Sequence, residues 1–99
     1  MITANHKIER LLKLLDKAEK LSGQFTGGYS NNFLSAQEFN TALADSINKL
    51  KDGDYDQLNE LSLWFAPTCA WDDFILTDGE DLANEIYPLV TELRTLFNV

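Results

Sequence analysis

Apolar residues recur at intervals of three and four in four segments of this 99-residue chain. On a helical wheel of about 100° per residue, such residues fall on one side, which is the pattern of amphipathic helices that share a core. The segments are residues 4–21, 35–50, 54–65 and 79–98. No segment shows the apolar and polar alternation of a half-buried strand. The sequence therefore predicts an all-α fold in one domain, residues 1–99.

Residues that cap or break helices mark the ends of these segments. Ser35 and Glu38 form a capping box at the start of the second segment. Asp52-Gly53 is a stop signal after the second segment, and Pro67 follows the third. Pro88 lies inside the fourth segment, whose apolar residues keep their phase across the proline. We therefore expect one Pro-kinked last helix rather than two separate helices.

The connections predict how the four helices are arranged. The one around Asp52-Gly53 is short, whereas residues 22–34 and 66–78 form two long loops. Short connections join antiparallel neighbours, so we expect an up-down-up-down four-helix bundle with both long loops at one end. Loops of this length are often functional.

Aromatic residues in the two long loops allow two interpretations. Phe25, Phe33 and Phe74 have no polar group, so we expect them to cover the open end of the core. Tyr29 and Trp71 have polar tips that also suit a half-exposed contact surface. The sequence does not decide whether Leu63 and Trp64, at the end of the third segment, belong to the core or to an interface.

The charges are distributed unevenly along the chain. The net charge is −8, and no Lys or Arg occurs from Asp52 to Leu93, a stretch that holds eleven acidic residues. Acidic residues near helix N-termini are stabilising, which explains about half of them but not Glu60, Asp72, Asp73 or Glu85. The negative electrostatic field of such a stretch attracts a basic partner and repels nucleic acid and anionic membranes.

The residues that usually carry catalysis or bind cofactors are scarce. One Cys and one His exclude an internal disulfide and the common zinc sites, and no Glu-x-x-His motif for a di-iron centre occurs. The Asp52–Asp56 segment resembles the start of a calcium loop but lacks its glycine and its final glutamate. We expect no enzymatic activity, no cofactor and no metal. No secretory signal and no apolar run of membrane-spanning length is seen, which favours the cytoplasm.

The segment from Leu63 to Phe74, Leu-Trp-Phe-Ala-Pro-Thr-Cys-Ala-Trp-Asp-Asp-Phe, resembles a signature of small bacterial immunity proteins encoded beside polymorphic or contact-dependent toxins. In size, acidity and helical content the chain is also similar to the immunity proteins of nuclease colicins, although it lacks their Tyr-Tyr-Pro motif. The resemblance implies a toxin inhibitor without catalytic activity.

The sequence thus predicts a cytoplasmic immunity protein that neutralises a basic nuclease toxin, without contacting nucleic acid or membrane. We expect the contact surface to include six residues: Tyr29, Glu60, Trp71, Asp72, Asp73 and Glu85. One alternative is an adaptor that self-associates, as a weak homodimer, through Leu63, Trp64 and the loops. Another is an enzyme or metal protein that uses the carboxylates.

Overall fold

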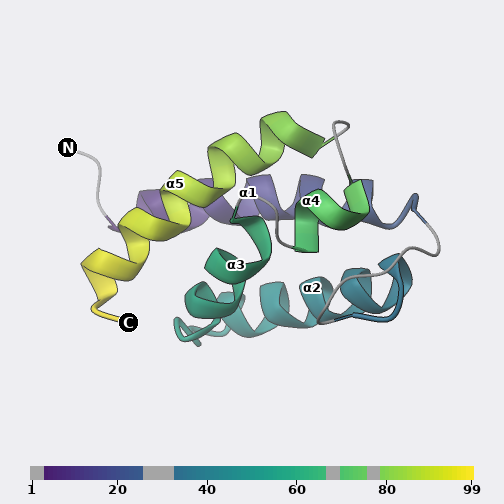
Figure 1. Cartoon of the computed structure of the whole chain (residues 1–99). Helices are drawn as coiled ribbons and strands as arrows, with labels where there is room; N and C mark the ends of the chain where they lie inside the picture. Colours follow the sequence, from purple (N-terminus) through teal and green to yellow (C-terminus); the bar gives the residue numbers. More distant parts are fainter. Residues whose placement is uncertain (1–3, 26–32, 67–69, 76–78) are drawn as a thin grey trace.

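The protein is a bundle of helices in a computed structural model that describes residues 4–25, 33–66, 70–75 and 79–99, without the side chains of residues 4, 5, 72 and 73. The helices are α1 (Ala4–Ser22), α2 (Ala36–Lys51), α3 (Gln57–Phe65), α4 (Ala70–Ile75) and α5 (Glu80–Phe97) (Figure 1). Within these residues there is no β-strand. α1, α2, α3 and α5 correspond to the four predicted segments, which confirms the all-α four-helix bundle.

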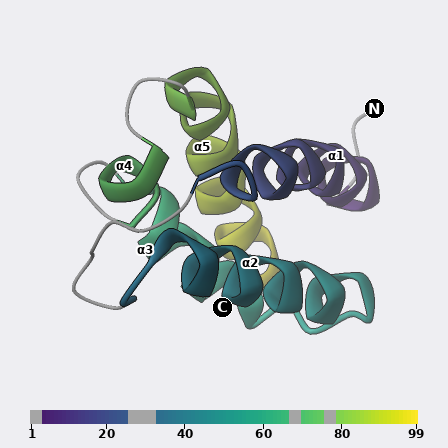
Figure 2. The same cartoon turned by 90° about the vertical axis from the view of Figure 1, so that its right-hand side faces the viewer.

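The four long helices pack around a common core. α1 lies against α2 and α5, and α3 lies against the same two helices. α1 and α2 run in opposite directions, and α5 returns across α1 (Figures 1 and 2). α3 rises steeply from α2 toward α5 (Figure 1). Its two buried sides are therefore covered by different helices.

The apolar faces predicted from the sequence form this core. Fully buried side chains occur at helical spacing on every long helix, for example Leu11, Leu15 and Ala18 on α1 and Ile86, Val90 and Leu93 on α5. Burial of a large aliphatic side chain contributes about 1.5–3 kcal/mol, so these faces supply most of the driving force for folding. α2 begins as predicted, because the Ser35 side chain accepts a hydrogen bond from the Glu38 backbone N–H. α5 continues through Pro88 as one helix, and its kink stays a prediction.

The structure corrects the prediction of a long loop over residues 66–78, because α4 occupies residues 70–75. α4 buries Ala70, Trp71, Phe74 and Ile75 against α3 and the start of α5. Most of the other predicted loop, residues 26–32, lies outside the described residues. The second predicted loop is therefore interrupted by a helix, and the placement of both connections at one end stays a prediction.

Six aromatic side chains form one buried group, called the aromatic cluster here: Phe33, Phe39, Trp64, Phe65, Trp71 and Phe74. Phe39 of α2 stacks on Phe74 of α4 with ring centroids 5.5 Å apart. Trp71 lies 4.9 Å from Phe65 of α3, centroid to centroid. The expectation that Phe33 and Phe74 cover the core is confirmed, and Trp64 is a core residue.

Candidate partner-binding surface

Trp71, one of the six predicted contact residues, is fully buried, so its assignment to a contact surface is wrong. Its indole N–H donates a hydrogen bond of 2.9 Å to the Gly79 carbonyl oxygen, just before α5 begins. The indole N–H, which favoured a half-exposed position in the prediction, therefore has its hydrogen-bond acceptor inside the protein. Trp71 joins α4 to α5 and serves the fold.

The structure describes no side chain for three of the other five predicted contact residues. Tyr29 lies outside the described residues. Asp72 and Asp73 belong to α4, but their side chains also lie outside what the structure describes. Their assignment to a contact surface stays a prediction.

Glu60 and Glu85 are both exposed, but they lie on different sides of the molecule. Glu60 is one turn after Gln57, whose side-chain oxygen accepts a hydrogen bond of 2.8 Å from Ser46 of α2. Glu60 itself lies opposite the buried Leu58, Leu61 and Phe65, on the outward side of α3. Glu85 is two turns before Glu92, which pairs with Lys7 of α1. Glu85 therefore lies toward α1, and the two glutamates do not form one patch.

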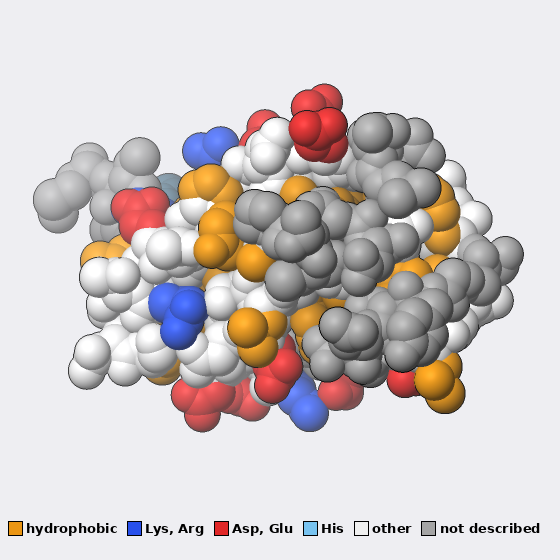
Figure 3. Space-filling view, in the orientation of Figure 1, with side chains coloured by type: hydrophobic (Ala, Val, Ile, Leu, Met, Phe, Trp, Pro, Cys, Tyr) orange, Lys and Arg blue, Asp and Glu red, His pale blue; other side chains and the backbone are white. Residues whose placement is uncertain are grey.

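The outward side of α3 and the turn before it carry acidic residues around an exposed leucine. Asp56, Glu60 and Leu63 follow at intervals of four and three residues, opposite the buried Leu58, Leu61 and Phe65. The two carboxylates are exposed, and 60% of Leu63 is accessible to solvent. Asp54 in the preceding turn is also exposed. We call Asp54, Asp56, Glu60 and Leu63 the α3 surface; Figure 3 shows apolar and acidic side chains next to one another where α3 lies in Figure 1.

Contacts on both sides hold α3 in place beneath this surface. The Ser46–Gln57 hydrogen bond joins it to α2, and Arg94 of α5 donates a hydrogen bond of 3.1 Å to the Ser62 hydroxyl oxygen. In the turn before α3, Tyr55 stacks on Phe97 of α5 at a centroid distance of 4.2 Å. Groups on a helix anchored in this way need little ordering when a partner binds, which lowers the entropic cost of association.

Most carboxylates of the α3 surface have no internal partner. The ion pairs among the described residues are Lys7–Glu92, Asp16–Lys20 and Asp45–Lys49. None of them includes an acidic residue of the α3 surface. The Asp54 carboxylate accepts a hydrogen bond of 3.1 Å from the Gln57 side-chain amide. Asp56 and Glu60 therefore present negative charge to solvent.

Sequence reasoning singled out Glu60, attributed Asp54 and Asp56 to a helix start, and left Leu63 open between core and interface. A signal was present, since residues 56, 60 and 63 share the helical face opposite the buried positions. This shared face was overlooked because Asp54 and Asp56 were explained as residues at the start of a helix. The structure shows no side-chain cap from Asp56, the N-cap residue of α3.

No family model, curated protein or solved structure matches the chain. Among the described residues, no group of three or more His, Cys, Asp or Glu side chains is arranged to hold a metal ion. Over the same residues, every helix is too short or too polar to cross a membrane. The α3 surface is therefore interpreted from its own geometry and charge.

Proposed function

We propose that this chain is an immunity protein that binds a basic nuclease toxin through the α3 surface and neutralises it. The observation that carries the proposal is an exposed leucine on an anchored helix, flanked by the unpaired carboxylates of Asp56 and Glu60. The charge distribution supports it, because no Lys or Arg occurs between Asp52 and Leu93. The resemblance of the Leu63–Phe74 segment to immunity proteins supports the same interpretation.

The chemistry of such a partner is complementary to this surface. A nuclease must be basic where it binds phosphates, and an acidic protein can occupy or cover that region. Opposite charges accelerate encounter and set the orientation of docking. Leu63 would then bury its side chain at the centre of the contact, where desolvated apolar groups contribute most to affinity. We place this action in the cytoplasm, where a nuclease toxin meets its substrate.

The test begins with the product of the neighbouring open reading frame. We expect it to end in a basic domain that co-purifies with this chain and loses nuclease activity in the complex. Asp56→Lys combined with Glu60→Lys should weaken binding by at least about tenfold, equal to about 1.4 kcal/mol. Failure of the wild-type chain to bind or inhibit that domain would contradict the proposal.

A matched control is available on α2. Glu38→Lys combined with Asp45→Lys makes the same change in net charge at two exposed positions outside the α3 surface. This control variant should bind nearly as tightly as wild type at physiological ionic strength. Equal losses in both double variants would show that only overall charge matters, and would remove the α3 surface from the proposal.

Self-association is the second candidate function, and the exposure of Leu63 favours it. Trp64 no longer contributes to this alternative, because it lies in the aromatic cluster. Analytical ultracentrifugation of wild type and Leu63→Ser separates the two functions. A micromolar dimer that Leu63→Ser dissociates would favour the adaptor, whereas a monomer favours the immunity protein.

A further inference from the structure

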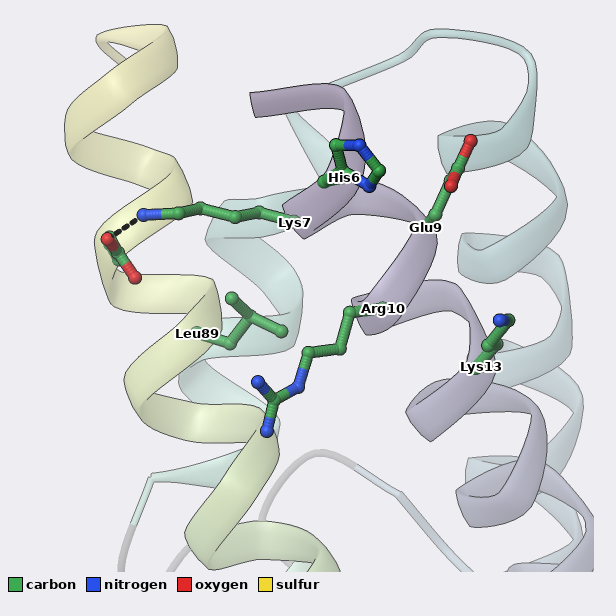
Figure 4. A pocket seen from close by; sticks show the side chains of 7 residues that line it. His6, Lys7, Glu9, Arg10, Lys13 and Leu89 are labelled. Atoms are coloured by element: carbon green, nitrogen blue, oxygen red, sulfur yellow. Dashed lines mark hydrogen bonds and ion pairs between the residues drawn. The ribbon is translucent and has the colours of Figure 1, made fainter. Parts of the chain in front are cut away.

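A groove lies along the outer side of α1, next to the C-terminal half of α5. It is lined by His6, Lys7, Glu9, Arg10 and Lys13 of α1 together with Leu89 and Glu92 of α5, and its volume is about 590 Å³. Figure 4 shows Lys7 reaching across to α5, where it pairs with Glu92, and Arg10 extending along the gap between the two helices. An ion pair therefore joins the two helices at the groove, which Arg10, Lys13 and Glu9 also line.

The charge of this groove is opposite to that of the molecule. Five of the eight Lys and Arg residues lie within the first twenty positions, in a chain whose net charge is −8. Arg10 and Lys13 are exposed and form no ion pair among the described residues. Lys7 is held by Glu92, so Arg10 and Lys13 are the cations available to a ligand.

The groove also offers an apolar contact. Leu89 lines it and is almost fully buried, so the groove has an aliphatic wall beside the cations. Leu96, two turns further along α5, is 53% exposed. A ligand that combines carboxylates with an aliphatic side chain would satisfy both features, because the aliphatic group would lie near Leu89 while one carboxylate pairs with Arg10 beside it. A second carboxylate would have to reach Lys13, which extends from the other side of α1 (Figure 4).

We propose that the groove binds a short acidic segment of a second partner protein, one that carries one or two carboxylates beside an aliphatic residue. The volume lies within the range of about 300–1,000 Å³ typical of small-ligand sites, which limits the occupant to a few side chains. A long polyanion is disfavoured, because Glu9 and Glu92 line the same groove and would repel all but one or two acidic groups. This site is independent of the α3 surface and uses none of its residues.

The test is a titration of the isotopically labelled chain with a peptide of alternating glutamate and leucine residues, followed by two-dimensional NMR. We expect the largest shifts at the backbone amides of Lys7, Arg10, Lys13, Leu89 and Glu92. Arg10→Gln combined with Lys13→Gln should weaken binding at least tenfold. Lys49→Gln combined with Lys51→Gln, an equal charge change on α2, should change it less than twofold.

Three results would overturn the proposal. One is the absence of shifts in the groove at millimolar peptide, or shifts confined to other elements. Another is an equal response to inorganic phosphate at the same concentration, which would make the groove a general anion site. The third is a concentration dependence of the same resonances without peptide, which would show that a second copy of the chain occupies the groove. Loss of toxin binding with intact peptide binding would contradict only the α3 surface.

Discussion

The aromatic cluster and the α3 surface lie on two sides of the same short helix and have opposite roles. Trp64 and Phe65 of α3 are buried in the cluster, whereas Leu63 beside them in the sequence is exposed. Within the cluster, the Trp71 indole N–H is satisfied internally by its hydrogen bond to the Gly79 carbonyl oxygen. The α3 surface leaves Asp56 and Glu60 unpaired. Aromatic residues in a predicted loop can thus stabilise the fold, while a leucine on a helix faces the solvent.

Removal of the Trp71 ring should produce the largest loss of stability. Trp71→Ala leaves a cavity among Phe39, Phe65 and Gly79 and should lower the free energy of unfolding by about 3–5 kcal/mol. Urea denaturation followed by circular dichroism measures it. A decrease in the free energy of unfolding below about 1 kcal/mol would contradict a structural role for Trp71 and favour its assignment as a contact residue.

A methyl group at position 79 should be the next most damaging change. A Cβ built on Gly79 would lie 2.6 Å from Cγ2 of Ile75 and would also overlap the Trp71 ring. Gly79→Ala should therefore cost about 1–3 kcal/mol, because the indole must move and its bond to the Gly79 carbonyl weakens. Gly23→Ala is the matched control, since its Cβ would approach no atom closer than 3.5 Å. Equal stability of the two variants in urea would show that α4 is not packed as described.

Truncation of Leu63 should have the smallest effect on stability. Leu63→Ala should change the free energy of unfolding by no more than about 0.5 kcal/mol, because the side chain is mostly exposed. The same variant should weaken toxin binding at least tenfold, if Leu63 is buried in the complex. Calorimetric titration with the toxin domain, beside urea denaturation, checks both parts. Unchanged affinity would remove Leu63 from the contact.

α1, α2 and α5 could be predicted from the sequence because their apolar spacing is regular over four or more turns. α1 and α5 were predicted to within one or two residues for this reason. α4 could not be found in this way, because six residues are too few to show a helical period. Its aromatic residues were instead attributed to a loop.

The candidate site was harder to predict than the fold. Trp71 is buried because Gly79, eight residues later, brings its backbone close enough to accept the indole hydrogen bond. Glu60 and Glu85 are separated because Glu60 lies on the outward side of α3, whereas Glu85 lies on the side of α5 that carries Glu92 and faces α1. Both outcomes depend on how the helices are rotated about their axes, which apolar spacing gives only approximately.

The association rate constant at several ionic strengths tests the central claim most directly, because electrostatic steering is screened by salt. Stopped-flow mixing would compare the wild-type chain with the Asp56→Lys and Glu60→Lys double variant against the toxin domain. We predict fast association that slows steeply with salt for wild type, and slower association with a shallower salt dependence for the variant. Identical rate constants at every ionic strength would contradict the claim that the α3 surface recognises a basic partner.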